Sequence, residues 1–205
     1  MSRNTVITIG REYGSGGREI GKKLAESLGI PFYDKELITL AAKESGMAEE
    51  FVEQADEKSD FWASFSMSIN LYGDSPVPLV EMPINDRLFL IQSKVITELA
   101  KKGSCVIVGR AANYVLKEEG MDCLNVFLYA SLENKIKRIM ITENLTEKQA
   151  KDKIHKTDKK RASYYNYYTS EKWGRKESYD IAIDSCLLGI DGTVEVIKQI
   201  VQLKK

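Results

Sequence analysis

The sequence is poor in the residues that build disulfide frameworks and metal sites. Its 205 residues include one histidine, His155, and three scattered cysteines, Cys105, Cys123 and Cys186, with no CxxC pair. An odd number of separated cysteines does not support a set of disulfides, and so few thiolate and imidazole ligands do not support a zinc centre. Free thiols are typical of a reducing compartment, so the sequence predicts a cytoplasmic protein.

The sequence also lacks net charge and long apolar runs. Thirty Lys and Arg residues balance thirty Asp and Glu residues, so no overall field would draw the chain to nucleic acid or to an anionic membrane. No apolar run approaches the roughly 20 residues of a membrane-spanning helix, and the N-terminal residues resemble a strand rather than a signal peptide. We therefore expect no nucleic-acid partner and no membrane association.

What is present is an alternation of strand-like and helix-like segments. Apolar runs at residues 5–9, 30–33, 104–109, 124–129 and 179–185 predict five strands. Helical periodicity lies between and after them, at residues 20–28, 34–46, 85–102 and 146–169 and from Thr193 onward. This order is typical of right-handed βαβ units, so the sequence predicts an α/β fold with a five-stranded parallel sheet flanked by helices.

The length suits one domain with one core, residues 1–205. Residues 45–83 are harder to interpret, because aromatic side chains alternate with acidic and small ones. They predict helices outside the sheet that cover a cleft, followed by a loop at 73–83, which holds three of the four prolines. Homodimerisation through this segment is a further hypothesis.

A glycine-rich segment, GREYGSGG (residues 10–17), connects the first strand to the first helix. Glycines at such a place let backbone N–H groups turn toward an anion, and the N-terminus of the helix adds partial positive charge. Phosphate binding is one interpretation, and a tight strand-to-helix turn without a ligand is the other.

Further segments are more specific together than any one alone. They are GREYGSGGREIGKKLAE, PFYDKELI, CVIVGRAANYVL, FLYASLENKIKRI, DKKRASYYNYYT and YDIAIDS, in this order. Over nearly the entire chain they resemble the cytidylate kinase-like family of P-loop proteins. The resemblance implies a nucleoside-monophosphate-kinase-like fold, ATP and Mg²⁺ as cofactors, a helical acceptor lobe at about 45–83 and a lid at about 146–175 that closes over phosphates.

The loop departs from the P-loop pattern GxxxxGK[ST] at three positions, of which Arg18 is at the Ser/Thr position. Gly17 stands at the lysine position, and Arg11 stands at the first glycine position. We predict that Arg18, helped by Arg11, supplies the missing charge; the alternative is that Arg18 lies on an exposed helix turn. Ser15 and Glu19 are candidate magnesium contacts, although the metal ligands are unknown. The predicted cofactor-binding residues are Arg11, Gly14, Ser15, Gly16, Gly17, Arg18 and Glu19.

Arg110 is the strongest single candidate on the acceptor side. It follows the predicted strand CVIVG, at the edge of the sheet where α/β proteins bind ligands, and it matches the GR pair that contacts the acceptor phosphate in true cytidylate kinases. Those kinases continue with an aspartate, whereas this chain has Ala111, so the acceptor need not be cytidylate. Further candidates for substrate binding, each equally compatible with a surface ion pair or a helix cap, are Asp34, Arg87 and Gln92.

The segment from Lys148 to Arg161 holds seven Lys or Arg residues. It has two interpretations, a solvated amphipathic helix or the basic lid that the resemblance implies. In the lid interpretation the catalytic residues are Arg138, Asp158, Lys159 and Arg161, together with Arg18 and Arg110. The aromatic run YYNYYT (164–169) and Trp173 would stack on a base or pack the lid against the sheet.

Three hypotheses for function follow. The first is an ATP-dependent kinase that transfers a phosphoryl group to a nucleoside monophosphate, or to a related small acceptor. The second is a nucleotide-binding pseudokinase or sensor without turnover, which the absent lysine and Ala111 favour. The third is an interaction protein that uses the aromatic segment 61–72 as its contact surface.

Overall fold

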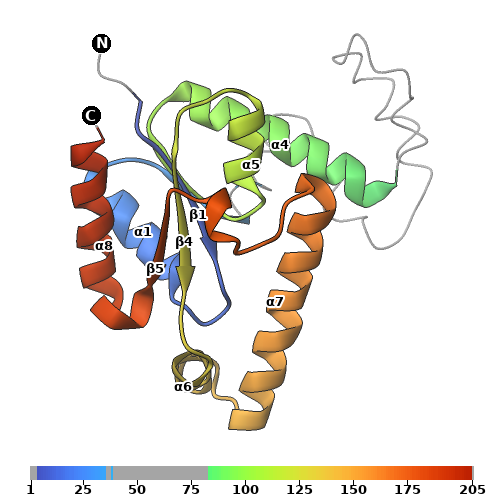
Figure 1. The fold of residues 1–205 in the computed structure, drawn as a ribbon, viewed down its shortest axis with the longest axis vertical. Helices are drawn as coiled ribbons and strands as arrows, with labels where there is room; N and C mark the ends of the chain where they lie inside the picture. Colours follow the sequence, from blue (N-terminus) through green and yellow to red (C-terminus); the bar gives the residue numbers. More distant parts are fainter. Residues whose placement is uncertain (1–3, 36–37, 39–82, 205) are drawn as a thin grey trace. The chain divides into compact units, whose positions relative to one another are not determined.

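The computed structural model describes residues 4–35, 38 and 83–204 (Figure 1). The chain divides into a larger unit, residues 1–35 and 96–205, and a smaller unit, residues 36–95. Of the smaller unit the description covers Ile38 and the stretch from Pro83 into helix α4 (Ile84–Lys102). Apart from a few positions at their ends, the predicted helix at 34–46, the lobe at 45–83 with its aromatic segment, and the proline-rich loop lie outside the described residues.

The larger unit contains a five-stranded sheet in the order β2-β3-β1-β4-β5, in which every neighbouring pair is parallel. The α/β fold with a parallel five-stranded sheet is thus confirmed. β1 lies in the middle, with β3 and β4 on either side, as expected from their continuous apolar runs. The strands are β1 (Val6–Arg11), β2 (Phe32–Tyr33), β3 (Cys105–Val108), β4 (Leu124–Tyr129) and β5 (Ile181–Asp184).

Helices cover both faces of this sheet (Figure 1). α1 (Gly17–Leu28) and α8 (Ser185–Leu203) lie together on one face, where Ile20, Leu24 and Ile197 pack against strand residues such as Ile7 and Ile9. α5 (Ala112–Glu118) lies against the other face. Burial of these aliphatic side chains stabilises the fold by about 1.5–3 kcal/mol for each. No helix in the described part of the chain is both long enough and apolar enough to cross a bilayer.

Capping residues account for several of the helix ends. Gly29 closes α1 in the left-handed conformation, and the capping box predicted from Thr146 and Gln149 opens α7 (Glu147–Thr169). The prediction that the last helix begins at Thr193 is wrong, because Asp184 caps a helix that already begins at Ser185. Helix α8 is interrupted at Gly189, and this break hid its first turn from a periodicity argument.

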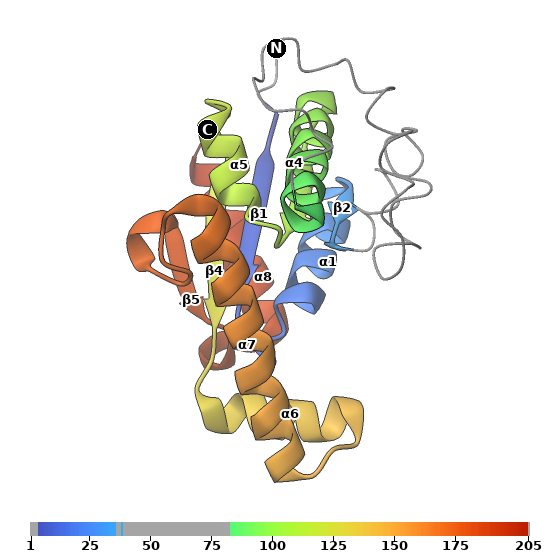
Figure 2. The same cartoon turned by 90° about the vertical axis from the view of Figure 1, so that its right-hand side faces the viewer.

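Helix α6 (Leu132–Glu143) follows β4 and packs across the first half of α7 beyond the carboxyl ends of the strands (Figure 2). Ile139, Ala150 and Ile154 form a small buried cluster between the two helices, and Tyr13 of the glycine-rich loop packs against it. The loop, α6 and α7 therefore form one continuous region at the edge of the sheet where a parallel α/β fold binds ligands.

Candidate functional site

The glycine-rich loop between β1 and α1 is held by its own backbone and by hydrogen bonds to β4 and α8. The Glu12 N–H donates to the carbonyl of Leu128 on β4, and the Ser185 hydroxyl donates to the carbonyl of Ser15. Gly14 and Gly16 have φ values of 86° and 76°, the region that favours glycine. The buried Ser15 hydroxyl donates to the Glu12 carbonyl, so its hydrogen is used within the loop.

A cavity of about 390 Å³ opens beside this loop, at the carboxyl ends of β1 and β3. Its size is within the range of small-molecule sites. Among the described residues that line it, five are basic and none is Asp or Glu. The basic residues are Arg11, Lys35, Arg110, Lys160 and Arg161, and the aromatic ones are Tyr164, Tyr165, Trp173 and Tyr179.

The backbone that follows β3 adopts an unusual conformation at this cavity. Gly109, Arg110 and Ala111 are consecutive and have φ values of 86°, 58° and 54°. For residues other than glycine this left-handed conformation costs about 1–2 kcal/mol each, and such strain is concentrated at functional sites. Arg110 lies with its guanidinium carbon 5.4 Å from the ring centre of Tyr164 on α7. The predicted candidate Arg110 therefore faces the cavity from a strained turn.

Arg11 ends β1 and carries its side chain to the turn after β3. A Cβ added to Gly109 would lie 2.1 Å from Nη1 of Arg11, so the guanidinium occupies the space that glycine leaves. Burial and the neighbouring guanidinium groups of Arg161 and Arg110 lower the pKa of Arg11 to about 9. An arrangement of like charges with so little counter-charge is an environment that an anion would stabilise.

Arg18 and Asp34 form an ion pair, with Nε 2.7 Å from Oδ2. Asp34 is buried, whereas the side chain of Arg18 is 66% exposed. The structure thus brings together a predicted cofactor residue and a predicted acceptor residue. Glu19, one turn away from Gly16, pairs with Arg138 of α6, so both of these predicted residues lie at the loop as well.

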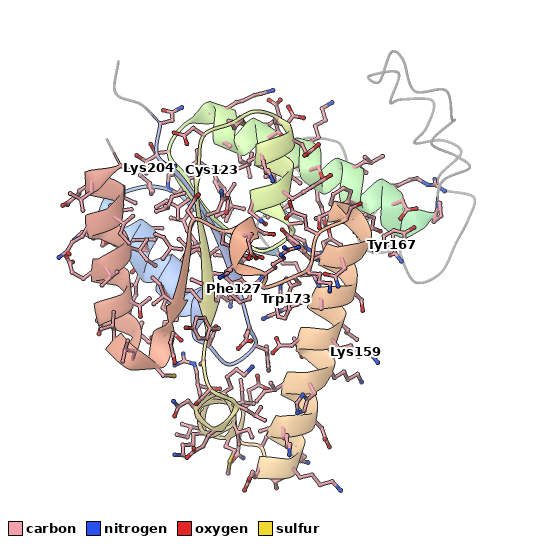
Figure 3. The ribbon with its side chains drawn as sticks, viewed as in Figure 1. Cys123, Phe127, Lys159, Tyr167, Trp173 and Lys204 are labelled. Atoms are coloured by element: carbon pink, nitrogen blue, oxygen red, sulfur yellow. The ribbon has the colours of Figure 1, made fainter. Side chains whose placement is uncertain are left out.

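Helix α7 presents one face to the cavity. The lining residues Thr157, Lys160, Arg161, Tyr164 and Tyr165 repeat at intervals of three and four, as one side of a helix does. Lys160 was missed by sequence reasoning, although this spacing from Arg161 and Tyr164 could have found it. The predicted Lys159 is exposed and points away from the sheet (Figure 3).

Asp158 lies in a second charged cluster, at the junction of the loop with α6 and α7. Lys135 of α6 places Nζ 2.8 Å from Glu12 Oε2 and 3.3 Å from Asp158 Oδ2. Asp158 also accepts the Tyr13 N–H at 2.7 Å. Burial raises the pKa of Asp158, and the Tyr13 N–H and Lys135 oppose that shift. Lys135 was not predicted, because the sequence LENKIKRI does not distinguish a buried lysine from an exposed one.

Arg161 connects this cluster to the cavity. Its Nη1 donates to the Arg11 carbonyl at 3.0 Å and lies 3.8 Å from Asp158 Oδ1, and its guanidinium carbon lies 5.5 Å from the ring centre of Tyr13. Asp158 and Arg161, both predicted for the lid, are therefore close in space, as residues three positions apart on a helix are.

Four further residues singled out in the sequence have the following surroundings. Arg87 and Gln92 are buried on α4, within the smaller unit, and their role in acceptor binding stays a prediction. Trp173 makes an edge-to-face contact with Phe127, with ring centres 5.6 Å apart, so its ring packs against the sheet while also lining the cavity (Figure 3). His155 is exposed.

The residues fit a phosphate group better than a directly bound metal. Guanidinium groups match phosphate oxygens through paired N–H donors, and the first turn of α1 offers N–H groups that lack partners within the helix. In the part of the chain that the structure describes, no three Asp, Glu, His or Cys side chains come together in a way that could hold a metal ion.

A parallel sheet of this topology, with a glycine-rich loop after its central strand, defines a P-loop kinase fold of the nucleoside-monophosphate-kinase type. The model of the cytidylate kinase-like family matches residues 6–186, and the chain belongs to that family.

Individual relatives are more distant. A cytidylate kinase of Archaeoglobus fulgidus is 27% identical, with 97% of this chain and 96% of the relative covered. The crystal structure of an uncharacterized protein from Eubacterium ventriosum has a TM-score of 0.68 at 30% identity, covering 97% of this chain and 98% of that one. Shikimate kinase from Bacteroides thetaiotaomicron shares the fold, with a TM-score of 0.54 at 16% identity over 98% of this chain and 99% of that one.

Proposed function

We propose that the protein is an ATP-dependent phosphotransferase that phosphorylates a nucleoside monophosphate or a chemically related small acceptor that itself carries a phosphate. The observation that carries this proposal is the convergence of Arg11, Arg110 and Arg161 on one cavity beside the glycine-rich loop. Membership in the cytidylate kinase-like family supports the nucleotide as the substrate class.

The chemistry needs little covalent participation from the protein. An acceptor phosphate oxygen attacks the γ-phosphorus of ATP, the bond from that phosphorus to the β,γ-bridging oxygen breaks, and ADP leaves. The protein holds donor and acceptor in line and neutralises the charge of the moving group. Arg110, at the end of β3, is placed to hold the acceptor phosphate, and Arg161 of α7 to reach the transferred group.

The other predicted catalytic residues are assigned to the periphery of this arrangement. Arg138 lies beside the loop, its Cζ 3.5 Å from where a Cβ of Gly16 would be, and we assign it to the donor phosphates. Asp158 positions Arg161 and the Tyr13 N–H. Lys159 and Lys160 add positive charge on α7, the segment that we propose acts as the lid.

Magnesium would accompany ATP and neutralise phosphate charge, because Mg²⁺ in kinases is held largely by phosphate oxygens and water. The loop carboxylate of Glu19 is the residue that we propose contacts the hydrated ion. Its pairing with Arg138 would then change when nucleotide binds.

The identity of the acceptor depends on the turn that holds Arg110. Ala111 offers no side-chain acceptor for a sugar hydroxyl or a base, so we do not assign the acceptor as cytidylate. The aromatic wall formed by Tyr164, Tyr165 and Tyr179 suits a flat, partly apolar group.

An acceptor screen tests the proposal. The protein is incubated with ATP, Mg²⁺ and each of CMP, dCMP, UMP, AMP and GMP, and ADP release is recorded against a no-acceptor control. Acceptor-dependent ADP formation is the expected result. ATP binding by calorimetry without transfer to any acceptor would favour a sensor, and absence of nucleotide binding would overturn both functions.

A further inference from the structure

Two of the positions at which the loop departs from the P-loop pattern, 11 and 17, are neighbours in space. The pattern GxxxxGK places glycine at position 11 and lysine at position 17, whereas this chain has Arg11 and Gly17. A Cβ added to Gly17 would lie 2.6 Å from Cβ and 2.8 Å from Cγ of Arg11. The stem of Arg11 therefore runs past the α-carbon of Gly17, and arginine at position 11 leaves room for no side chain at position 17.

The far end of the same side chain is accommodated by a second glycine. Nη1 of Arg11 lies 2.1 Å, and Cζ 3.0 Å, from where a Cβ of Gly109 would be. Two glycines, one at each end of the side chain, thus leave a channel for Arg11 from the end of β1 to the wall of the cavity. A channel of this kind fixes the guanidinium in place before any ligand arrives.

We infer that Arg11 supplies the donor-phosphate cation that a lysine supplies in the standard P-loop, with Gly17 and Gly109 leaving the space it needs. This inference rests on the proposed function in one respect, namely that the donor is ATP. It names the residue that contacts the β- and γ-phosphates, and it explains the departures at positions 11 and 17 together, as a move of the positive charge from one position to the other.

The contrast with Arg18 decides which arginine takes this role. Arg18 is two-thirds exposed and its Nε already pairs with the buried Asp34. Arg11 lines the cavity, and the charges that act most strongly on it are the cations of Arg161 and Arg110. A phosphate would relieve like-charge repulsion at Arg11, whereas at Arg18 it would compete with a carboxylate.

The first part of the test removes the positive charge of Arg11 and keeps a long, unbranched side chain at that position. ATP binding in the presence of Mg²⁺ is measured by calorimetry for wild type, Arg11→Met and the control Arg175→Ala, a surface arginine that pairs with Glu177. We expect Arg11→Met to weaken ATP binding about 10- to 100-fold, the range of a charge-assisted contact, and Arg175→Ala to match wild type. Affinity of Arg11→Met equal to that of wild type would overturn the inference.

The second part is a double-mutant cycle that moves the cation back to its standard position. Gly17→Lys alone should weaken ATP binding, because its side chain meets the stem of Arg11. Arg11→Gly alone should weaken it by loss of charge, and R11G/G17K should bind more tightly than either single variant. Additive losses would contradict the inference. Thermal melting of each variant separates misfolding from weakened binding, and Arg11→Met alone decides the question if the double variant does not fold.

The inference and the proposed function can fail separately. ATP binding that depends on Arg11, in a protein that phosphorylates no acceptor, would support the inference and overturn the kinase. Phosphoryl transfer that persists in Arg11→Met with unchanged ATP affinity would support the kinase and overturn the inference. A wild-type protein that binds no ATP would overturn both.

Discussion

Two groups of charged side chains border the glycine-rich loop, and they differ in how their charge is balanced. At the junction of the loop with α6 and α7, Lys135 contacts two carboxylates, Glu12 and Asp158. At the cavity, Arg11 and Arg110 lie with Arg161 among lining residues of which, in the described part of the chain, none is acidic. In the first group the cation lies beside carboxylates, whereas the second has an excess of positive charge.

The difference separates a structural role from a binding role. A partly buried lysine that contacts two carboxylates holds segments together, and removing it leaves uncompensated charge. Neighbouring guanidinium groups repel one another, and this repulsion destabilises the fold unless a favourable interaction offsets it. A bound phosphate would provide that interaction. Sequence composition does not distinguish the two groups, because each is assembled from residues that lie far apart in the chain.

The largest effect is expected from Arg110→Ala, which removes charge from the cavity only. We expect kcat/KM for phosphoryl transfer to fall roughly 100- to 1,000-fold, as for loss of one preorganised group that stabilises transition-state charge. The Tm should stay within about 3 °C of wild type, because the substitution removes a cation–π pair with Tyr164 that is worth about 0.5–1 kcal/mol. ADP release and thermal melting check this, with Arg175→Ala as the matched arginine control. A Tm fall without loss of rate would assign Arg110 a structural role.

The opposite behaviour is expected of Lys135→Met, which breaks the first group. Glu12 would lose its cation and Asp158 would keep only Arg161, so the free energy of unfolding should fall by about 3 kcal/mol and the Tm by about 6–12 °C. Lys137→Met on the same helix is the control, since its pair with Glu133 is exposed and should matter by about 0.5 kcal/mol or less. Denaturant unfolding measures both.

The loss in Lys135→Met should also depend on pH. Burial already raises the pKa of Asp158, and removing Lys135 takes away a cause that lowers it. A carboxyl with a raised pKa takes up a proton more readily folded than unfolded, so its unfavourable charge is relieved as the pH falls. The stability difference between Lys135→Met and wild type should shrink from pH 7 to pH 5. A pH-independent difference would show that poorer packing, not charge, is the cause.

A smaller effect should follow from Gly109→Ala, which disturbs Arg11 without removing it. The added Cβ meets Nη1 of Arg11, and φ is 86°. We expect ATP affinity to fall about tenfold, together with about 1–2 kcal/mol of backbone strain. Gly120→Ala is the control, because Gly120 also has a positive φ, 64°, but an added Cβ would meet nothing within 4 Å. Equal ATP affinity in the two variants would mean that the position of Arg11 does not matter.

Much of the fold could be predicted because its signals are local. Strand β1, the end of α1 at Gly29 and the capping box of α7 follow from apolar runs, a glycine and a Thr–Gln pair. Helix α5 and the first turn of α8 were not predicted. α5 begins after Ala111 in a left-handed conformation without a side-chain cap, and Gly189 interrupts α8. Hydrophobic periodicity in the sequence reveals neither feature.

The site was predictable where it depends on strand ends and less so where it depends on tertiary contacts. Arg110 follows from its place after an apolar strand, and Arg161 from the resemblance of its segment to the lid of the family. The ion pair of Arg18 with Asp34 joins residues 16 positions apart, and the contacts of Lys135 with Glu12 and Asp158 join three separate elements. Such pairs become visible only after the chain has folded.

The smallest effect concerns the repulsion between Arg11 and the arginines around it, which should destabilise the fold when no anion is bound. Burial and the neighbouring cations of Arg161 and Arg110 lower the pKa of Arg11, so its charge opposes folding at neutral pH. Arg11→Met without nucleotide should therefore melt about 2–4 °C above wild type at pH 7.5, equivalent to ~1 kcal/mol. Saturating ATP should reverse the order, because only wild type retains the cation that binds it. If Arg11→Met melts below wild type both with and without ATP, Arg11 is a structural residue and both charged groups have a structural role.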